Sequence, residues 1–592
     1  MIGFRTDRKI SILDSNIASR KYWPWSDWIA ALVLFSATAA VVVWQNSRLG
    51  VLWDLSYVLD SSYRISLGDL PYRDFPFPHA PLTFLVQAAI IKLGGRVFWH
   101  TTVYCALMGG LATVLTWRIL LNVVRDTVAH ARLVAFLLSL PLAVLGIYCI
   151  FPHPFYDPDC TLAILLSVLL LQQIDHKPAS SWRALLAGSS LVIPLLVKQN
   201  TGLAFFVSAG LALLALMTIE MFRRRPLRRY LCALAGAIAG FSLALLLIHL
   251  SAGLKNYWHW TIEFAAARRT PARAEMLAIY QGKILLLWLA SFAAGAGLLW
   301  FRRRGQRVPA LLSALLMSAP FAWPAIYLLH DQDASERADR LIGVWPMLLI
   351  VAFVIAVASI KRRTGIALVL PFIVIAAVNG NFMSQQLWGS TYAVWPLFMI
   401  LFASAIAGLA WLLKSWSSWT TIPLAAIVAA SLLISGAFYV RAHERLDYAN
   451  LSEGELARST LPQLKGLSVR GDWIPNFEEL VRYSETNIPR DDALVLIPGE
   501  DLFYYTTGRR PRFPVLLFDH TTNPYSPEEI ANLCREKNIR WLIVKQDLQL
   551  EEDPVENRDH LIELLEKDFE QVESLNNYDI YRRNESEPDE AN

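Results

Sequence analysis

Cysteine is scarce in this chain, which contains only five among 592 residues. Four lie in or beside apolar stretches and the fifth stands alone near the C-terminus, a spacing that excludes both a disulfide framework and a cysteine-based zinc site. We also expect no cleavable signal peptide, because residues 1–27 are polar and have no separate apolar core. We therefore expect the first apolar stretch to serve as the insertion signal.

Charged residues make up only 18% of the chain, whereas 55% of the residues are hydrophobic and 21 are tryptophan. Apolar windows of about 15 to 22 residues recur between residues 28 and 440, the pattern of membrane-spanning helices. The sequence therefore predicts an α-helical polytopic membrane protein. The predicted spans are 28–45, 97–119, 132–151, 160–174, 183–197, 200–220, 230–250, 283–301, 308–329, 341–359, 365–380, 391–413 and 420–440.

Charge is distributed unevenly along the chain. Residues 1–440 carry 36 Lys and Arg against 18 Asp and Glu, whereas residues 441–592 carry 18 against 32. The basic residues of the first part fall in short loops between alternate spans, which predicts that these loops and the segment 1–27 are cytoplasmic. Basic residues confined to such loops do not indicate a nucleic-acid partner. With an odd number of spans, residues 441–592 form an extracytoplasmic domain that follows the membrane domain 28–440.

The acidic C-terminal part has the alternating patterns of an α/β domain. The predicted strands are Ala493–Ile497, Pro514–Phe518, Trp541–Lys545 and Tyr578–Arg582, and the predicted helices are Phe477–Thr486, Pro527–Lys537 and Asn557–Phe569.

The outer loop, residues 46–96, carries the most informative stretch. Residues 52–67 predict a short helix that ends at Gly68, a residue typical of helix C-termini. Asp54, Tyr57 and Arg64 share one face of this helix, and its leucines lie largely elsewhere, where we expect them to rest on the bilayer interface. A carboxylate, a phenol and a guanidinium on one face at a membrane surface suit the handling of a polar group on a lipid.

This loop resembles the first outer loop of the GT-C class of polytopic glycosyltransferases, in the family-39-like branch with protein O-mannosyltransferases and the lipid A aminoarabinose transferase. The matching elements are Asp54, Tyr57, Gly68, Pro71-Tyr72, Asp74-Phe75, His79 and Pro81-Leu82. The resemblance implies that Asp54 is the catalytic base, and we expect Tyr57, Tyr72, Asp74 and His79 to contact substrate. The alternatives are that Asp54 only caps or solvates an interfacial helix, and that Asp60, Asp69 and Asp74 are solvated loop residues. Many relatives have Asp-Glu where this chain has Asp54-Leu55, so a second carboxylate is expected elsewhere.

The sequence FPHPFYDPDC, residues 151–160, is the candidate source of that carboxylate. Asp157 is the expected second catalytic group, and His153 and Asp159 are expected to contact substrate. Two alternatives stand beside this interpretation. Asp159 is well placed to cap a helix beginning near Cys160, and the carboxylates with His153 also suit a divalent metal. No metal site is assigned on this pattern.

Several cations near the outer ends of spans are candidates for binding a lipid phosphate. Lys198 lies at membrane depth between two spans, where a lysine is costly unless it pairs, lines a cavity or extends to the interface. Arginine pairs suit phosphate and tryptophan faces suit sugars, although tryptophans also form interfacial belts. The candidate phosphate ligands are Lys198, Arg64, Arg268, Arg269, Arg337 and Arg340, with Trp258 as a candidate sugar contact.

These features together predict a glycosyltransferase of the plasma membrane, in bacteria the inner membrane. A hexose or pentose would pass from a polyprenyl-phosphate donor to a glycan, lipid or protein acceptor on the outer face, by inversion with an aspartate base. A flippase for a lipid-linked glycan is the first alternative, but no internal hydropathy repeat supports it and the ionisable residues lie in outer loops. An oligosaccharide ligase or polymerase is the second alternative.

Overall fold

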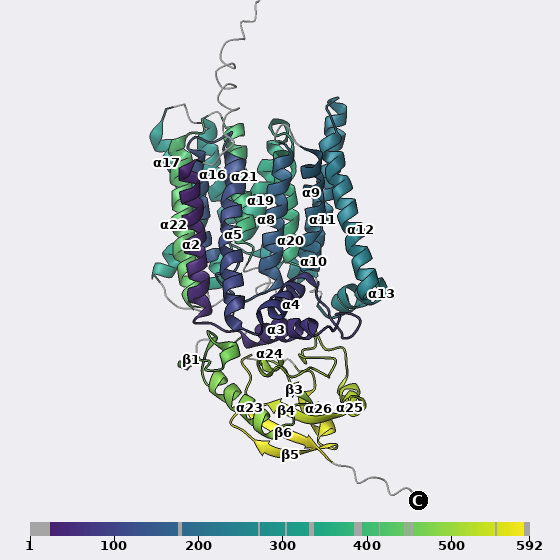
Figure 1. Cartoon of the computed structure of the whole chain (residues 1–592). Helices are drawn as coiled ribbons and strands as arrows, with labels where there is room; N and C mark the ends of the chain where they lie inside the picture. The colour runs from purple at the N-terminus through teal and green to yellow at the C-terminus, as the bar shows by residue number, and fades with distance from the viewer. Residues whose placement is uncertain are drawn as a thin grey trace, which may run out of the picture.

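The computed structural model describes residues 24–584, except for 176–179, 270–272, 302–304, 331–336, 384–392, 414, 443–445, 447–448, 450–453, 551–552 and 554. A bundle of long helices fills most of the molecule, and a small sheet-containing domain lies at one end of it (Figure 1). Two short helices, α3 Leu52–Ser66 and α4 Leu82–Gly94, lie between the bundle and this domain (Figure 1). The predicted fold class, a polytopic helical protein with a C-terminal α/β domain, is confirmed.

The bundle helices follow the predicted apolar windows. Their bounds are α2 Trp25–Asn46, α5 Phe98–Val124, α6 Ala131–Ser139, α7 Leu142–Leu145, α8 Tyr156–Ile174, α9 Ser181–Ser190, α10 Ile193–Val197, α11 Gln199–Phe222, α12 Arg228–Ser251, α16 Leu285–Phe301, α17 Arg307–His330, α18 Arg337–Ile342, α19 Trp345–Ala358, α20 Ile366–Asn381, α21 Trp395–Leu412 and α22 Ser418–Ala442. Within the described residues, nine helices are long and apolar enough to cross a membrane, and five shorter apolar helices accompany them. The count of thirteen spans stays a prediction.

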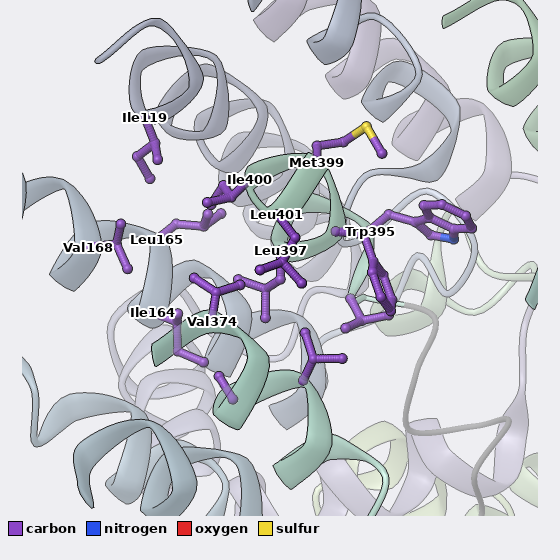
Figure 2. Packing of buried hydrophobic residues seen from close by; sticks show 14 of the residues in the cluster. Ile119, Ile164, Leu165, Val168, Val374, Trp395, Leu397, Met399, Ile400 and Leu401 are labelled. Atoms are coloured by element: carbon purple, nitrogen blue, oxygen red, sulfur yellow. The ribbon is translucent and has the colours of Figure 1, made fainter. Parts of the chain in front are cut away.

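The centre of the bundle is α21, which is the most buried of the long apolar helices. Its side chains Leu397, Ile400 and Leu401 pack beside residues of α5, α8 and α20, among them Ile164 and Val374 (Figure 2). By contrast, α2 and α12 keep most of their apolar surface exposed. Such outward apolar faces are what a bilayer covers.

Short elements follow α12 at the end of the bundle that faces the C-terminal domain. They are α13 Leu254–Trp258, the π-helix η1 His259–Phe264, α14 Ala265–Arg269, α15 Arg273–Met276 and the 3₁₀ helix η2 Ala278–Gln281. A further 3₁₀ turn, η3 Ile360–Arg362, follows α19.

The C-terminal domain contains a four-stranded sheet of order β3-β4-β6-β5, in which β3 and β4 are parallel and the other neighbours antiparallel. Strands β1 and β2 form a separate antiparallel pair. The elements are β1 Leu456–Arg458, η6 Pro462–Leu464, β2 Ser468–Arg470, α23 Trp473–Asn487, β3 Ala493–Ile497, α24 Phe503–Thr507, α25 Pro527–Glu536, β4 Ile539–Lys545, α26 Arg558–Leu565, β5 Phe569–Ser574 and β6 Tyr578–Arg583.

Three of the four predicted strands and all three predicted helices are present, with shifted ends. The predicted strand Pro514–Phe518 is wrong, because this segment is irregular and its backbone is used elsewhere. The carbonyl groups of Phe513 and Pro514 accept hydrogen bonds from Arg64 in the outer loop. Strand β5 was not predicted, because most of its residues are exposed and charged or polar.

Candidate active site

Helix α3, Leu52–Ser66, carries Asp54 in its first turn and is held at that end by the C-terminal domain. The backbone N–H of Leu52 donates to Oε1 of Gln549 at 2.6 Å, and Nε2 of Gln549 donates to the carbonyl of Gly50 at 2.9 Å. The backbone N–H of Gln549 in turn donates to Glu500 at 3.0 Å. One amide side chain therefore fixes the chain on both sides of the helix start, two residues from Asp54, which is half-buried.

A buried charge cluster holds Glu500 in place. The ammonium group of Lys545 lies 2.5 Å from Glu500 and 2.8 Å from Asp501, and Tyr578 donates its hydroxyl to Asp501 at 2.8 Å. All four side chains are buried, so the desolvated carboxylates depend on the lysine and the hydroxyl. This cluster therefore fixes the loop that presents Gln549 to α3.

The apolar face of α3 does not rest on the bilayer interface as the sequence led us to expect. Leu52, Leu55 and Leu59 are buried in a cluster with side chains of the C-terminal domain, including Phe503 and Tyr505. Amphipathic periodicity gives the direction of an apolar face, and it does not distinguish lipid from protein as the covering surface. Helix α3 is thus a docking helix for the C-terminal domain.

Two charged residues of α3 complete this contact. The Arg64 guanidinium donates to Asp69 and to the carbonyls of Phe513 and Pro514 at 2.9 to 3.0 Å, and it lies over the ring of Phe75. Burial lowers the pKa of Arg64, and its bond to Asp69 opposes that shift. The guanidinium is buried and hydrogen-bonded to the protein through Nε and Nη1, and its assignment as a phosphate ligand stays a prediction.

Asp60 accepts hydrogen bonds from the backbone N–H groups of Tyr504 and Tyr505, at 3.4 and 2.7 Å. These groups begin α24, so Asp60 satisfies donors at the start of that short helix. Burial raises the pKa of Asp60 to about 8, although both N–H groups oppose the shift. Asp60 therefore lies in the domain contact and is not a solvated loop residue.

The turn that follows α3 is stabilised by residues of the loop motif itself. Tyr72, which has a φ of +68°, donates its hydroxyl to the carbonyl of His79 at 2.6 Å. Asp74 accepts from the N–H of Leu70 at 2.7 Å and from Arg73 at 2.8 Å. The Arg73 hydrogen bond lowers the pKa of Asp74, and the Leu70 N–H adds to this. Tyr72 and Asp74 thus shape the turn, and the structure shows no substrate role for either.

His79 is the residue of this turn that faces the bundle. It is buried, its ring stacks on Tyr156 at 4.8 Å between centroids, and Tyr57 lies 5.1 Å away on α3. Tyr156 is the first residue of α8, and the Lys198 ammonium lies 5.9 Å from its ring. A series of aromatic contacts therefore connects the Asp54-bearing face of α3 with the start of α8.

The series ends at a buried ion pair. The ammonium group of Lys198 contacts the carboxylate of Asp157, and their side chains are 5% and 1% exposed. Lys198 also donates to Oδ1 of Asn381 at 3.1 Å, and Thr201 donates to the same oxygen at 2.8 Å. Asp157 and Lys198, which were predicted separately as site residues, are thus in direct contact, and interfacial extension of Lys198 is excluded. Helices α8, α11 and α20 all meet at this point.

Asp159 has a different environment from Asp157, although only one residue separates them. Its carboxylate accepts hydroxyl hydrogen bonds from Thr83 and Tyr104 at 2.7 Å and from Tyr148 at 2.6 Å. It makes no helix-capping bond, so the capping interpretation is wrong. The three hydroxyl donors come from three parts of the chain, so Asp159 connects these segments through hydrogen bonds. The structure does not place Asp159 at a substrate.

His153 does not join the carboxylates. Its ring is fully buried, and Nδ1 lies 3.4 Å from the side-chain amide of Asn46. Burial lowers the pKa of His153 to about 3, so the ring is neutral at physiological pH. Asp157 is paired with Lys198, and Asp159 is surrounded by hydroxyls. These groups do not converge on a common point, and no cluster of three metal-ligating side chains occurs within the described residues.

The described candidates Arg268, Arg340 and Trp258 make their contacts away from the ion pair. Arg268 donates to the carbonyl of His520 at 3.1 Å, and Arg340 lies over the ring of Tyr327. Trp258 ends α13 with 57% of its surface exposed. The side chains of Arg269 and Arg337 are outside those that the structure describes. Of the six predicted phosphate ligands, the described structure therefore brings only Lys198 into the buried cluster.

Two residues of the site were missed by the sequence reasoning. Asn381, the last residue of α20, follows an apolar run, and its side-chain oxygen accepts from Lys198. A polar residue at the end of an apolar span was the sequence feature that could have identified it. Gln549 offered none, because its partners lie almost 500 positions away in the chain.

Comparison with known proteins gives no family match and no curated relative. Among solved structures, the chain is similar to ArnT from Cupriavidus metallidurans bound to undecaprenyl phosphate, with 14% identity, a TM-score of 0.46 and coverage of 94% of this chain and 98% of that one. It is also similar to the Archaeoglobus fulgidus oligosaccharyltransferase in complex with Zn and sulfate, with 13% identity, a TM-score of 0.48 and coverage of 93% and 73%.

A third similar structure is the oligosaccharyltransferase AglB from Archaeoglobus fulgidus in complex with an inhibitory peptide and a dolichol-phosphate, at 11% identity, a TM-score of 0.46 and coverage of 88% and 70%. ArnT and AglB are GT-C glycosyltransferases, the class that the loop motif resembles. Likeness at TM-scores below 0.5 says nothing about chemistry, so the function of this chain must be inferred from its own residues.

Proposed function

We propose that this chain is an integral-membrane glycosyltransferase that moves a sugar from a polyprenyl-phosphate donor to an acceptor at the outer face of the membrane. The observation that supports it most is the buried Lys198–Asp157 pair, which joins the start of α8 to the start of α11 and is connected to the Asp54-bearing helix through His79 and Tyr57. A buried cation at membrane depth suits the phosphate of a lipid whose tail remains in the bilayer. In this proposal the carboxylate of Asp54 on α3 receives the acceptor from the outer face of the membrane.

The roles follow from the chemistry of inverting transfer. The acceptor hydroxyl attacks the anomeric carbon and gives its proton to the Asp54 carboxylate. The bond between that carbon and the phosphate oxygen breaks, and its electron pair leaves with the polyprenyl phosphate. Lys198 stabilises the negative charge on this leaving group. Asp157 and Asn381 hold the ammonium group in position, so Asp157 assists through Lys198.

The aromatic residues between these groups form the wall of the proposed sugar site. Tyr57 and His79 lie between α3 and the start of α8, with ring centroids 5.1 Å apart, and His79 stacks on Tyr156. Ring faces suit the apolar side of a pyranose or furanose, and the buried surroundings limit access of water. The sugar, hexose or pentose, and the acceptor are left open by this proposal.

Native mass spectrometry of the purified protein tests the donor assignment. The wild type is expected to retain polyprenyl phosphate or a polyprenyl-phosphate sugar, and a double variant Lys198→Met with Asp157→Asn is expected to lose it while staying folded. Lys92→Met serves as the control, because Lys92 is an exposed lysine on α4 near the same end of the bundle. Equal retention by the double variant would contradict the assignment and favour the flippase or ligase alternatives.

A further inference from the structure

A polar cavity lies at the opposite end of the bundle from the proposed active site. It has a volume of about 370 Å³ and lies among the C-terminal ends of α5, α8, α11 and α21 and the starts of α12 and α20. Helix α5 begins beside Gly466 of the C-terminal domain and reaches the cavity at its last turn. A rise of 1.5 Å per residue puts these two points of α5 about 36 Å apart.

Charge is concentrated in this cavity, with one more arginine than acidic residues. The charged residues of its lining are Arg125, Arg225, Arg229, Arg362, Asp126, Asp175 and Glu220. Apolar side chains, Val123, Leu370 and Trp411, complete the wall. A general excess of basic residues in cytoplasmic loops does not require that four arginines share one cavity.

The acidic residues of the cavity are largely occupied by the protein itself. Asp175 accepts the N–H of Ile366 at 2.5 Å and the hydroxyl of Tyr230 at 3.1 Å. A Cβ at Gly365 would collide with that carboxylate, so the glycine permits this close approach. Glu220 is buried 3.7 Å from Arg225.

The third carboxylate belongs to Asp126, whose side chain is 80% exposed and lies 3.6 Å from Arg125. A carboxylate so exposed is well hydrated, and water screens its field at the neighbouring arginines. Asp126 therefore does little to neutralise the cavity.

Arg225 and Arg229 have N–H groups that form no short hydrogen bond with the acidic residues of the cavity. The closest nitrogen-to-oxygen distances are 3.4 Å for Arg229 to Asp175 and 3.7 Å for Arg225 to Glu220, which are longer than good hydrogen bonds. Arg362 makes no ion pair with any described residue, and it is exposed at the rim. Guanidinium groups with unused planar donors are suited to phosphate oxygens.

We propose that this cavity binds the phosphate group of an anionic ligand through Arg225, Arg229 and Arg362. Two sources share this chemistry. The phosphate belongs either to an anionic phospholipid head group, whose acyl chains suit the apolar side chains of the wall, or to a soluble phosphate ester. The proposal is independent of the transferase function, because no residue of the proposed active site takes part.

Titration of the full-length protein in detergent tests the proposal in two arms. Phosphatidylglycerol binding is followed by native mass spectrometry, with phosphatidylcholine as the zwitterionic control, and glycerol 3-phosphate binding is followed by thermal shift. The cavity variant is Arg225→Gln with Arg362→Gln. Its matched control is Arg228→Gln with Lys361→Gln, which removes the same charge from neighbouring residues outside the cavity.

The cavity variant is expected to bind the phosphate ligand roughly tenfold more weakly or worse, and the control within about twofold of wild type. Loss in the phosphatidylglycerol arm assigns a lipid, and loss in the glycerol 3-phosphate arm assigns a soluble ester. Arg362→Gln alone, which breaks no ion pair of the described structure, is expected to weaken binding in the same arm. Equal weakening by cavity and control variants, or no binding to wild type in either arm, would overturn the proposal.

Discussion

The buried Lys198–Asp157 pair gives the sharpest energetic prediction. With side chains 5% and 1% exposed, neither charge has access to water if its partner is removed. Removal of one member of such a pair typically costs about 3–5 kcal/mol. Asp157→Asn leaves the ammonium with the Asn381 oxygen at 3.1 Å, so its cost is expected near about 3 kcal/mol. Lys198→Met strands a buried carboxylate and is expected near about 5 kcal/mol.

The double variant Asp157→Asn with Lys198→Met removes both charges, so it is expected to be less destabilised than either single variant. Unfolding free energies from SDS titration in mixed micelles, followed by tryptophan fluorescence, measure all three. Arg73→Gln is the matched control, because it breaks an ion pair whose side chains are 52% and 33% exposed, where water screens the charges, and it is expected to change the unfolding free energy little. Additive losses in the double variant would refute a buried, coupled pair.

Two further predictions concern the contact between α3 and the C-terminal domain. Gln549→Ala leaves the N–H of Leu52 unsatisfied, so it is expected to lower the free energy of unfolding by about 1–3 kcal/mol. It is also expected to lower kcat more than it changes KM. The control Gln546→Ala, which removes an exposed amide, is expected to leave stability and kinetics unchanged. The pKa of Asp60 in the folded protein, about 8, lies above its ordinary value of 3.8, so the folded state binds this proton more tightly than the unfolded state does. The resulting contribution to the free energy of unfolding is fully present below about pH 4 and is lost as the pH rises towards 8. Asp60→Asn should flatten that slope in unfolding titrations between pH 5 and 8; an unchanged slope would place the titration elsewhere.

Much of the fold was predictable because it depends on local pattern. The apolar windows became helices, and α3 ended where Gly68, with a φ of +105°, permits a turn that other residues resist. The juxtaposition of Lys198 and Asp157 was expected only as a shared outer position, and the structure made it a direct contact. Periodicity predicts which face of a helix a residue occupies. A charged side chain buried at membrane depth is costly unless it forms an ion pair or hydrogen bonds.

The rest depended on contacts between distant parts of the chain. Asp157 and Asp159 are two residues apart and equally acidic, but one meets an ammonium and the other three hydroxyls. Arg64 has the local setting of a phosphate ligand, yet carbonyls some 450 positions away accept its hydrogen bonds. No local signal distinguishes these outcomes, because each partner is set by tertiary packing.

Whether Asp54 is the base of a transfer reaction can be decided by measuring chemistry and donor binding side by side in Asp54→Asn. Release of polyprenyl phosphate from a radiolabelled polyprenyl-phosphate sugar, with an envelope extract as acceptor, measures transfer, and native mass spectrometry measures the bound donor. We expect a loss of turnover of about 10²- to 10⁴-fold with donor binding unchanged, and partial activity in Asp54→Glu. Undiminished turnover in Asp54→Asn would contradict the assignment of Asp54 as the base.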